Sequence, residues 1–218
     1  MKLVVTSDTH GCFPNIPTCD IVIIAGDMFP GKYDRDIEAQ SRWYDKKLKP
    51  WIEALPCRYV VIVPGNHDYY WEKIFEEVND PIPNINSKEI VLCNCGVELM
   101  GLKIYGTPNI PPPLRNFAFS QTEQELKATF KQIPNHIDIL ISHAAPYGVG
   151  GLGEMEDGDI GCKELTEAIA DKKIRYLFCG HIHNGNHEKV EWQGKILYNV
   201  SYCDNNKEPK YDVLEIEL

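Results

Sequence analysis

Five short apolar stretches in this sequence each end directly at side chains that can bind a metal ion or transfer a proton. Apolar runs of strand length bounded by polar residues are typical of buried β-strands. Open α/β sheets place their binding sites at the carboxyl ends of the strands, so we expect these polar groups to meet in one site. The groups that follow the stretches are Asp8 and His10, Asp27, Asn66 to Asp68, His143, and His181 with His183.

The candidate metal ligands combine carboxylate, amide oxygen and imidazole. Such a mixture suits Mn, Fe or Zn, whereas Ca and Mg favour sites made of oxygen alone and structural Zn recruits thiolates. The set is too large for one ion and sensible for two. We therefore expect two divalent transition-metal ions, with Mn preferred and Fe or Zn as alternatives. The expected ligands are Asp8, His10, Asp27, Asn66, His143, His181 and His183.

Two adjacent metal ions predict phosphoester chemistry. Ions bridged by a carboxylate lie about 3.5 to 4 Å apart and can hold both the attacking and the leaving oxygen of an in-line displacement. A water that bridges the ions would become a hydroxide near neutral pH and could attack phosphorus without a protein nucleophile.

The apolar stretches also predict the elements that position these groups. One helical stripe covers residues 34–55, and the order strand, helix, strand favours parallel pairing with right-handed crossovers. Pro50 should break or kink this helix near Lys49, because proline removes a backbone donor. The predicted strands that deliver the polar groups cover residues 3–6, 20–25, 58–63, 137–141 and 175–179.

Further elements follow from turn and capping signals. Residues 120–123 have the form of a capping box and open a helix that Pro134 ends. A second helix is expected over residues 163–172. Gly194 indicates a hairpin between two short strands, and residues 211–218 alternate like a half-exposed closing strand. Short strands are also expected at residues 90–92, 97–100 and 103–105.

Composition bounds the class of protein. The chain has 218 residues, of which 43% are hydrophobic, and this suits a single α/β domain over residues 1–218. The net charge of −10 and the pI near 5.2 argue against a protein that neutralises many phosphates. We therefore expect a small-molecule phosphoester as the substrate, with nucleic acid an unlikely partner and the oligomeric state left open.

The cellular location is expected to be cytoplasmic. The apolar run at the N-terminus is too short for a signal peptide, and no later run reaches the length of a membrane span. The eight cysteines are scattered and form no C-x-x-C pattern, which favours free thiols in a reducing compartment.

The polar blocks resemble those of a known superfamily. In order and number, Asp8-x-His10, Gly26-Asp27, the Gly65 to Asp68 block, His143 and Gly180-His181-x-His183 resemble the calcineurin-like metallophosphoesterases. The resemblance implies a four-layer α-β-β-α sandwich of two mixed β-sheets flanked by helices, with a dinuclear metal centre at one edge.

The resemblance also implies roles for individual residues. His67 would bind no metal but would contact the phosphoryl group and protonate the leaving oxygen. Asp68 would either orient His67 or cap the helix that follows, and the two interpretations are compatible. The first metal would be held by Asp8, His10, Asp27 and His183, and the second by Asp27, Asn66, His143 and His181, with Asp27 as the bridge.

Within the superfamily, the chain is most similar to small metallophosphoesterase-domain proteins related to class III cyclic nucleotide phosphodiesterases. This similarity rests on Ser7-Asp8-Thr9-His10, Gly106-Thr107-Pro108, the segment 117–119, residues 161–165 and Asn199-x-Ser201. The chain departs from that pattern at residues 143–146, where alanines follow the histidine. Residues 28–31 lack the Asp-Arg-Gly continuation of Ser/Thr protein phosphatases, so a phosphoprotein substrate is disfavoured.

Two loops could shape substrate specificity. Arg115, Phe117 and Phe119 follow a proline-rich loop and could form a substrate lip with aromatic faces for a base, although core packing would also explain both phenylalanines. Residues 148–153 fit the pattern G-x-G-x-x-G, but they do not join a strand directly to a helix, so we reject a dinucleotide site. The loop over 148–159 covers the metal site or is an ordinary surface loop.

These observations predict a dinuclear metal-dependent phosphoesterase that hydrolyses small or nucleotide-like phosphodiesters through a metal-bridging hydroxide. A phosphomonoesterase or a nuclease on the same metal centre is the enzymatic alternative. A non-catalytic scaffold with a decayed site ranks below both, since every expected ligand and His67 are present.

Overall fold

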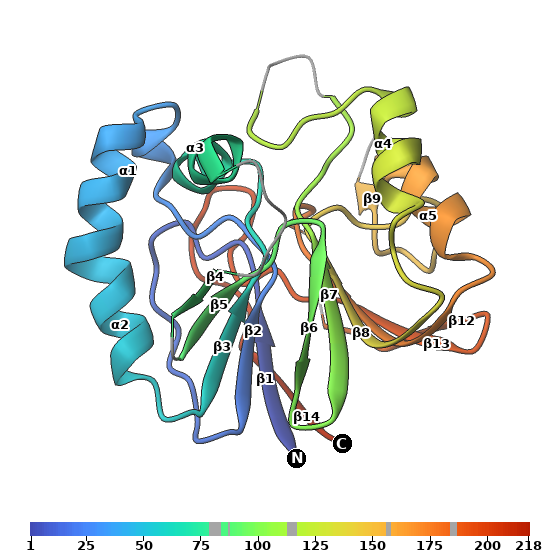
Figure 1. The fold of residues 1–218 in the computed structure, drawn as a ribbon, viewed down its shortest axis with the longest axis horizontal. Coiled ribbons are helices and arrows are strands. Elements are labelled where there is room, and N and C mark those ends of the chain that lie inside the picture. The colour runs from blue at the N-terminus through green and yellow to red at the C-terminus, as the bar shows by residue number, and fades with distance from the viewer. Residues whose placement is uncertain (79–83, 87, 113–116, 156–157, 184–186) are drawn as a thin grey trace.

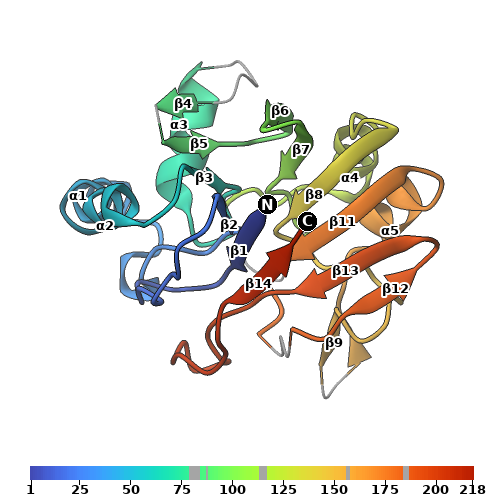
Figure 2. The ribbon, with the colours of Figure 1, turned by 90° about the horizontal axis from the view of Figure 1, so that it is seen from below.

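Two mixed β-sheets pack against each other in the middle of the molecule, and helices cover their outer faces (Figure 1). The computed structural model describes residues 1–78, 84–86, 88–112, 117–155, 158–183 and 187–218. The layers run helix, sheet, sheet, helix, as the resemblance implied. Both termini lie together at the end of the sheets seen from below in Figure 2.

The first sheet carries three of the strands that deliver polar groups. Its central strands β1, β2, β3 and β5 run parallel, while β14 and β4 pair antiparallel at its edges. Its strands, in spatial order, are β14 (Leu214–Glu217), β1 (Lys2–Thr6), β2 (Ile21–Ile24), β3 (Tyr59–Ile62), β5 (Glu89–Val91) and β4 (Asn84–Asn86).

The second sheet carries the other two. Strands β13, β11, β8 and β7 run parallel, with β12 and β6 antiparallel at the edges. Its strands, in spatial order, are β12 (Val190–Trp192), β13 (Lys195–Asn199), β11 (Lys173–Cys179), β8 (His136–Ser142), β7 (Leu102–Thr107) and β6 (Cys95–Leu99). A separate small ribbon pairs β9 (Glu154–Met155) with β10 (Gly158–Asp159).

Three apolar clusters hold these layers together. The central cluster joins the inner faces of the two sheets and includes Val5, Val61 and Ile141, all fully buried. A second cluster packs α4 (Glu123–Phe130) and α5 (Lys163–Ile169) onto the second sheet. The third packs helices onto the first sheet, namely α1 (Ile37–Trp43), α2 (Lys49–Ala54) and α3 (Tyr69–Val78). Strands buried on both faces explain the continuous apolar runs of the sequence.

The helical region over residues 34–55 is interrupted just before Lys49, where we predicted a break or kink. A π-helical turn over Tyr44–Leu48 joins α1 to α2, and Pro50 lies in the first turn of α2. Proline is tolerated there because its missing N–H falls where the π-helical hydrogen bonding changes to that of α2. The extra residue in the π-helical turn Tyr44–Leu48 therefore accommodates Pro50 within the helical region.

The predicted capping box at residues 120–123 is also shifted in the structure. Thr122 is the N-cap of α4 and accepts the N–H of Glu125, while Glu125 accepts the N–H of Thr122 in return. The motif is therefore of the predicted kind but begins two residues later, because the sequence offers the same spacing twice.

The two sheets meet where their strands deliver polar groups. Ser7, just after β1, forms a parallel bridge with Ser201, which follows β13. The N–H of Ser7 donates to Val200 at 3.0 Å, and the N–H of Tyr202 donates to Ser7 at 2.9 Å. The carboxyl ends of both sheets are thus fastened to each other at one edge. Among the described residues, no helix is long and apolar enough to cross a membrane.

Candidate metal centre

The predicted ligands come from strand ends of both sheets and meet at one edge of the sandwich. Asp8 and His10 follow β1, Asp27 follows β2 and Asn66 follows β3 in the first sheet. His143 follows β8, and His181 with His183 follow β11, in the second sheet. The site is therefore built across the junction of two sheets rather than along the edge of one.

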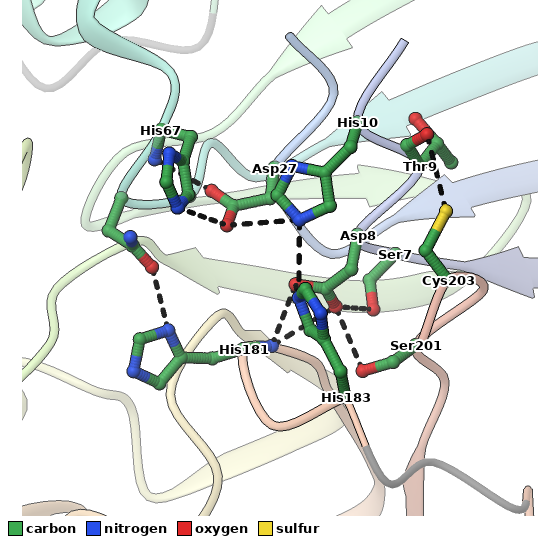
Figure 3. A network of polar contacts seen from close by, with 12 residues as sticks. Ser7, Asp8, Thr9, His10, Asp27, His67, His181, His183, Ser201 and Cys203 are labelled. Atoms are coloured by element: carbon green, nitrogen blue, oxygen red, sulfur yellow. Dashed lines mark hydrogen bonds and ion pairs between the residues drawn. The ribbon is translucent and has the colours of Figure 1, made fainter. Parts of the chain in front are cut away.

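One set of donors has a geometry that could hold a cation. Asp8, His10, Asp27 and His183 each offer a ligand atom, and these atoms all lie within 4.8 Å of one another. The Nε2 atoms of His10 and His183 are 3.2 Å apart, and His183 Nε2 is 3.3 Å from Asp8 Oδ1. Figure 3 shows these side chains pointing toward one another. This is the first ligand set that the resemblance implied.

A second set converges beside the first. Asn66 Oδ1 lies 2.9 Å from His143 Nε2 and 2.6 Å from His181 Nδ1. Asp27 contributes to both sets: its Oδ1 lies 3.5 Å from His143 Nε2, and its Oδ2 lies 3.9 Å from His10 Nε2. Asp27 therefore lies between two adjacent groups of donors, where a bridging carboxylate must be.

The hydrogen bonds of two histidine rings fit these donor groups to cations. His143 Nδ1 lies 2.8 Å from the carbonyl oxygen of Ala25, and His183 Nδ1 lies 2.9 Å from that of Asp204. A carbonyl oxygen only accepts, so each Nδ1 carries the proton and each neutral ring presents a lone pair at Nε2. Those lone pairs face the oxygens of Asn66 and Asp8, an arrangement that a cation between them stabilises.

In the metal-free protein, protons take the place of the cations. Burial lowers the pKa of His143, but the neighbouring Asp27 carboxylate outweighs burial and raises it to about 9. Burial likewise opposes the charge on Asp8, but His183 outweighs burial and holds the pKa of Asp8 well below its usual range. Metal and proton therefore compete for the same lone pairs.

The backbone is bent sharply to present these ligands. Asp8, His10, Asp27 and His181 all have positive φ, at 51°, 44°, 55° and 69°. Left-handed conformations of this kind are uncommon for residues other than glycine and gather at functional sites. Gly65 shows how tight the site is, since a Cβ there would lie 2.3 Å from Asp27 Oδ1. The Gly-Asn and Gly-Asp pairs of the sequence reflect this crowding.

Two serines beside the ligands were not among our predicted site residues. The hydroxyl groups of Ser7 and Ser201 both donate to Asp8 Oδ2, at 2.5 and 2.9 Å, and the N–H of His181 lies 3.1 Å from both oxygens of Asp8. These donors orient a carboxylate that is fully buried. The Asn199-x-Ser201 pattern was the sequence signal that could have identified Ser201.

His67 lies beside both donor sets and belongs to neither. Its Nε2 is 3.9 Å from Asp27 Oδ2, and its ring meets His10 at 5.2 Å between centroids. Its Nδ1 lies 2.8 Å from Asp34 Oδ1 and 2.9 Å from Oδ2. Burial lowers the pKa of His67, but Asp27 and Asp34 outweigh it, so the net pKa is raised. No sequence motif pointed to Asp34.

The prediction that Asp68 orients His67 is wrong. The Asp68 carboxylate is fully buried and accepts the N–H groups of Gly65, Asp27, Met28 and Phe29 at 2.7 to 3.2 Å. Burial and the charge of Asp27 raise its pKa to about 7, although these N–H donors oppose the shift. Asp68 therefore fastens the loop of Asp27 to the loop of Asn66, while Asp34 holds the His67 ring.

The predicted substrate lip is only partly visible. Arg115 lies outside the described residues. Phe117 is half-buried, and its ring lies 5.1 Å from that of His67. Phe119 is 7% exposed and belongs to the core cluster behind the first sheet, so it forms no part of a lip. Core packing, the alternative weighed for both residues, holds for Phe119, and Phe117 also packs against the second and third clusters while its ring faces His67.

The glycine-rich loop near residue 150 is fixed by its own acidic residue. Asp159 accepts the N–H of Gly148 at 2.6 Å and that of Gly161 at 2.8 Å. Val149 and Leu152 are buried against the second sheet. The Asp159 carboxylate thus accepts hydrogen bonds from the loop itself. The loop joins no strand directly to a helix, which agrees with rejecting a dinucleotide site.

The family model described as calcineurin-like phosphoesterase matches residues 1–185, which include every ligand of both sets. This chain belongs to the calcineurin-like phosphoesterases. Membership, together with the cluster of metal-binding side chains, makes it a metal-dependent phosphoester hydrolase.

Individual proteins share the same region. Metallophosphoesterase domain-containing protein 1 from Homo sapiens is 28% identical over 244 residues, which cover 100% of this chain and 71% of that protein. A protein named probable rhamnogalacturonate lyase C, from Emericella nidulans, is 29% identical over 87% of this chain. The match covers 18% of that longer protein, so this phosphoesterase corresponds to a small part of it.

The fold is also found among solved structures. A dimetal phosphatase from Danio rerio superposes with a TM-score of 0.54 at 12% identity, over 91% of this chain and 86% of that one. At this identity the likeness concerns the fold alone. It agrees with the sandwich of two mixed sheets described above.

Proposed function

We propose that this phosphoesterase hydrolyses small, nucleotide-like phosphodiesters and that His67 protonates the leaving oxygen. The observation that carries the proposal is the bond between the His67 ring and Asp34, 2.8 Å long at Nδ1. It fixes the ring with Nε2 directed toward Asp27, beside both donor sets.

When bound at the two donor sets, divalent ions lower the pKa of a water molecule and offset charge on the phosphoryl group. We propose manganese as the native metal, because the carboxylate, amide and imidazole donors suit it. Asp8, His10, Asp27 and His183 would hold one ion. Asp27, Asn66, His143 and His181 would hold the other.

The His67–Asp34 pair can deliver a proton to the substrate. Asp34 accepts the Nδ1 proton and stabilises the imidazolium form, so the second proton resides on Nε2. From there it passes to the leaving oxygen as the ester bond breaks, and His67 remains as a neutral ring still bonded to Asp34. A positioned acid of this kind contributes about 10² to 10⁴-fold to the rate, most for poor leaving groups.

The surroundings of His67 favour a substrate with an aromatic group. Phe117 presents a half-buried ring at 5.1 Å from the His67 ring, tilted by 58°. A nucleobase or aryl group attached to the leaving oxygen could pack against that ring. The acidic chain, at −10, argues against a polynucleotide substrate. The eight free thiols favour a reducing compartment, so we place the protein in the cytoplasm.

A substrate panel tests the proposal. The purified protein, reconstituted with Mn, would be assayed with bis-p-nitrophenyl phosphate, p-nitrophenyl phosphate, adenosine 2′,3′-cyclic phosphate and a single-stranded oligonucleotide. We expect kcat/KM for the two small diesters to exceed that for the monoester and the oligonucleotide by about tenfold or more. A monoester preference would replace this proposal with a phosphomonoesterase, and rapid cleavage of the oligonucleotide would replace it with a nuclease.

A further inference from the structure

A lysine from the C-terminal part of the chain lies against the turn that leads to Asp34. Lys207 lies in a tight turn just before the last strand, and its ammonium reaches the 3-10 turn Gly31–Tyr33. A Cβ placed on Gly31 would lie only 2.5 Å from Lys207 Nζ, so the glycine leaves the space that the ammonium occupies. Residue 31 is a few positions before Asp34, which holds His67.

The turn that carries Lys207 is fixed to the site. Asp204 Oδ1 accepts the N–H groups of Asn206 and Glu208 at 2.8 and 3.2 Å, and the N–H of Lys207 donates to the Asp204 carbonyl at 2.8 Å. The same carbonyl accepts the Nδ1 proton of the ligand His183 at 2.9 Å. Lys207 itself has a left-handed backbone, with φ of 63°. The Asp204 carbonyl therefore fixes the position of the Lys207 main chain relative to the ligand His183.

The charge of Lys207 reaches both histidines on this side of the centre. Burial is the main cause of the lowered pKa of His10, and Lys207 adds to it. Burial is also the largest influence lowering the pKa of His67, and Lys207 acts in the same direction, against Asp27 and Asp34. The ammonium is thus close enough to affect each ring electrostatically.

Lys207 keeps its charge available. Within the described part of the chain, no carboxylate forms an ion pair with it. Its side chain is half-buried. An ammonium that is positioned and unneutralised, in a protein of net charge −10, is suited to bind an anionic group of a ligand.

We propose that Lys207 binds a second phosphate of the substrate, separate from the phosphodiester that is cleaved. The inference rests on the proposed function and narrows it: the preferred substrate is a nucleotide-like diester with a further phosphate. Phe117 lies beside His67, and Lys207 lies against the turn that ends at Asp34, the residue bonded to His67, so the aromatic part and the second phosphate could be bound at the same time. Lysine acts here as a point charge and requires no bidentate geometry.

Binding measurements test the inference independently of turnover. Titration calorimetry on the Mn-loaded protein would compare adenosine 3′,5′-bisphosphate with adenosine 3′-phosphate. We expect the second phosphate to tighten binding about tenfold, in the range of one charge-assisted contact at a partly exposed site. Lys207→Met, which keeps the length of the side chain without its charge, should remove this preference, while Lys207→Arg should retain most of it.

Two further variants test whether the preference depends on the position of the Lys207 ammonium rather than on positive charge anywhere in this segment. Gly31→Ala places a methyl group where the ammonium lies, and residue 31 has no left-handed φ that would forbid alanine, so this variant should also weaken the preference. Lys210→Met removes an exposed lysine of the same segment, which packs over Tyr211, and should leave the preference intact.

Equal binding of both nucleotides by the wild-type protein would overturn the inference, as would equal weakening of both by Lys207→Met. These results differ from failure of the proposed function. If the bisphosphate preference depends on Lys207 but neither small diester is hydrolysed, the second-phosphate site stands and the phosphodiesterase proposal fails.

Discussion

Asp34 holds the His67 ring through Nδ1, at 2.8 and 2.9 Å from its two carboxylate oxygens, although the two residues are 33 positions apart. Asp34 directly follows the 3-10 turn Gly31–Tyr33 and is its C-cap, with its N–H donating to Gly31 at 3.1 Å. The residue next to His67 in sequence, Asp68, is directed elsewhere. Support of the His67 ring and support of the surrounding loops thus come from two different aspartates.

The Asp34→Asn variant should separate proton delivery from metal binding. The amide keeps an acceptor for the Nδ1 proton but loses the charge that stabilises the imidazolium. We expect kcat/KM for an alkyl phosphodiester to fall about 10 to 100-fold, with a smaller loss for a nitrophenyl diester, whose leaving group needs no proton. Metal content, measured by plasma mass spectrometry, should not change.

The matched control is Asp45→Asn, which removes an exposed carboxylate from the π-helical turn. It should leave kcat/KM for both diesters unchanged. Equal losses for the alkyl and nitrophenyl esters in Asp34→Asn would argue against the acid role of His67.

Asp27→Ala should remove both metal ions together. Its two carboxylate oxygens face different donor sets, Oδ1 toward His143 and Oδ2 toward His10. Asn66→Ala removes a donor from one set only and should weaken the binding of one ion more than that of the other. Metal stoichiometry after dialysis distinguishes the cases, and two retained ions in Asp27→Ala would exclude the bridging role.

The metal-free protein should lose stability as pH rises from about 6 to 9. His143 has its pKa raised to about 9 in the folded state, chiefly by Asp27 acting against burial, from an ordinary value of 6.5. A histidine with a raised pKa stabilises the folded state fully below the unfolded pKa, and this stabilisation is lost as pH rises through the folded pKa. The loss should reach at most about 3 kcal/mol.

Urea unfolding of the metal-free protein at pH 6 and pH 9 measures this loss. The His143→Gln variant should show a much flatter pH dependence, and Mn should reduce the dependence in the wild-type protein because the ion takes the place of the proton. An identical slope in His143→Gln would assign the effect to other groups.

The two phenylalanines should respond differently to replacement by alanine. Phe119→Ala removes a ring from the core and should lower the free energy of unfolding by about 3 to 5 kcal/mol. Phe117→Ala removes a half-buried ring beside His67 and should lower kcat/KM for nucleotide-like diesters more than for a methyl diester. Thermal unfolding measures the stability effect of Phe119→Ala, and kcat/KM for the two diesters measures the binding effect of Phe117→Ala. Equal kinetic losses for both diesters in Phe117→Ala would remove its role in binding the aromatic group.

Local sequence was sufficient to identify the strands and the ligand types. An apolar run such as Val60 to Val63 can only be buried on both faces, and the Gly65-Asn66-His67 turn that follows must then emerge at the strand end. The sandwich with its metal centre at one edge agreed with the family resemblance. Prediction was less accurate where the same signal occurs twice, as at Thr122, and it did not reveal that the interruption before Pro50 is a π-helical turn.

The sequence by itself determined which groups gather at one edge as candidate metal ligands, because strand ends and the residues that follow them are neighbours along the chain. Only the tertiary structure decided that Asp34 rather than Asp68 holds His67, that Phe119 is core, and that Lys207 lies against Gly31. Those relationships depend on where separate loops cross the junction of the two sheets. Such crossings leave no periodic or spacing signal in the chain, because packing between distant segments, not local conformation, sets them.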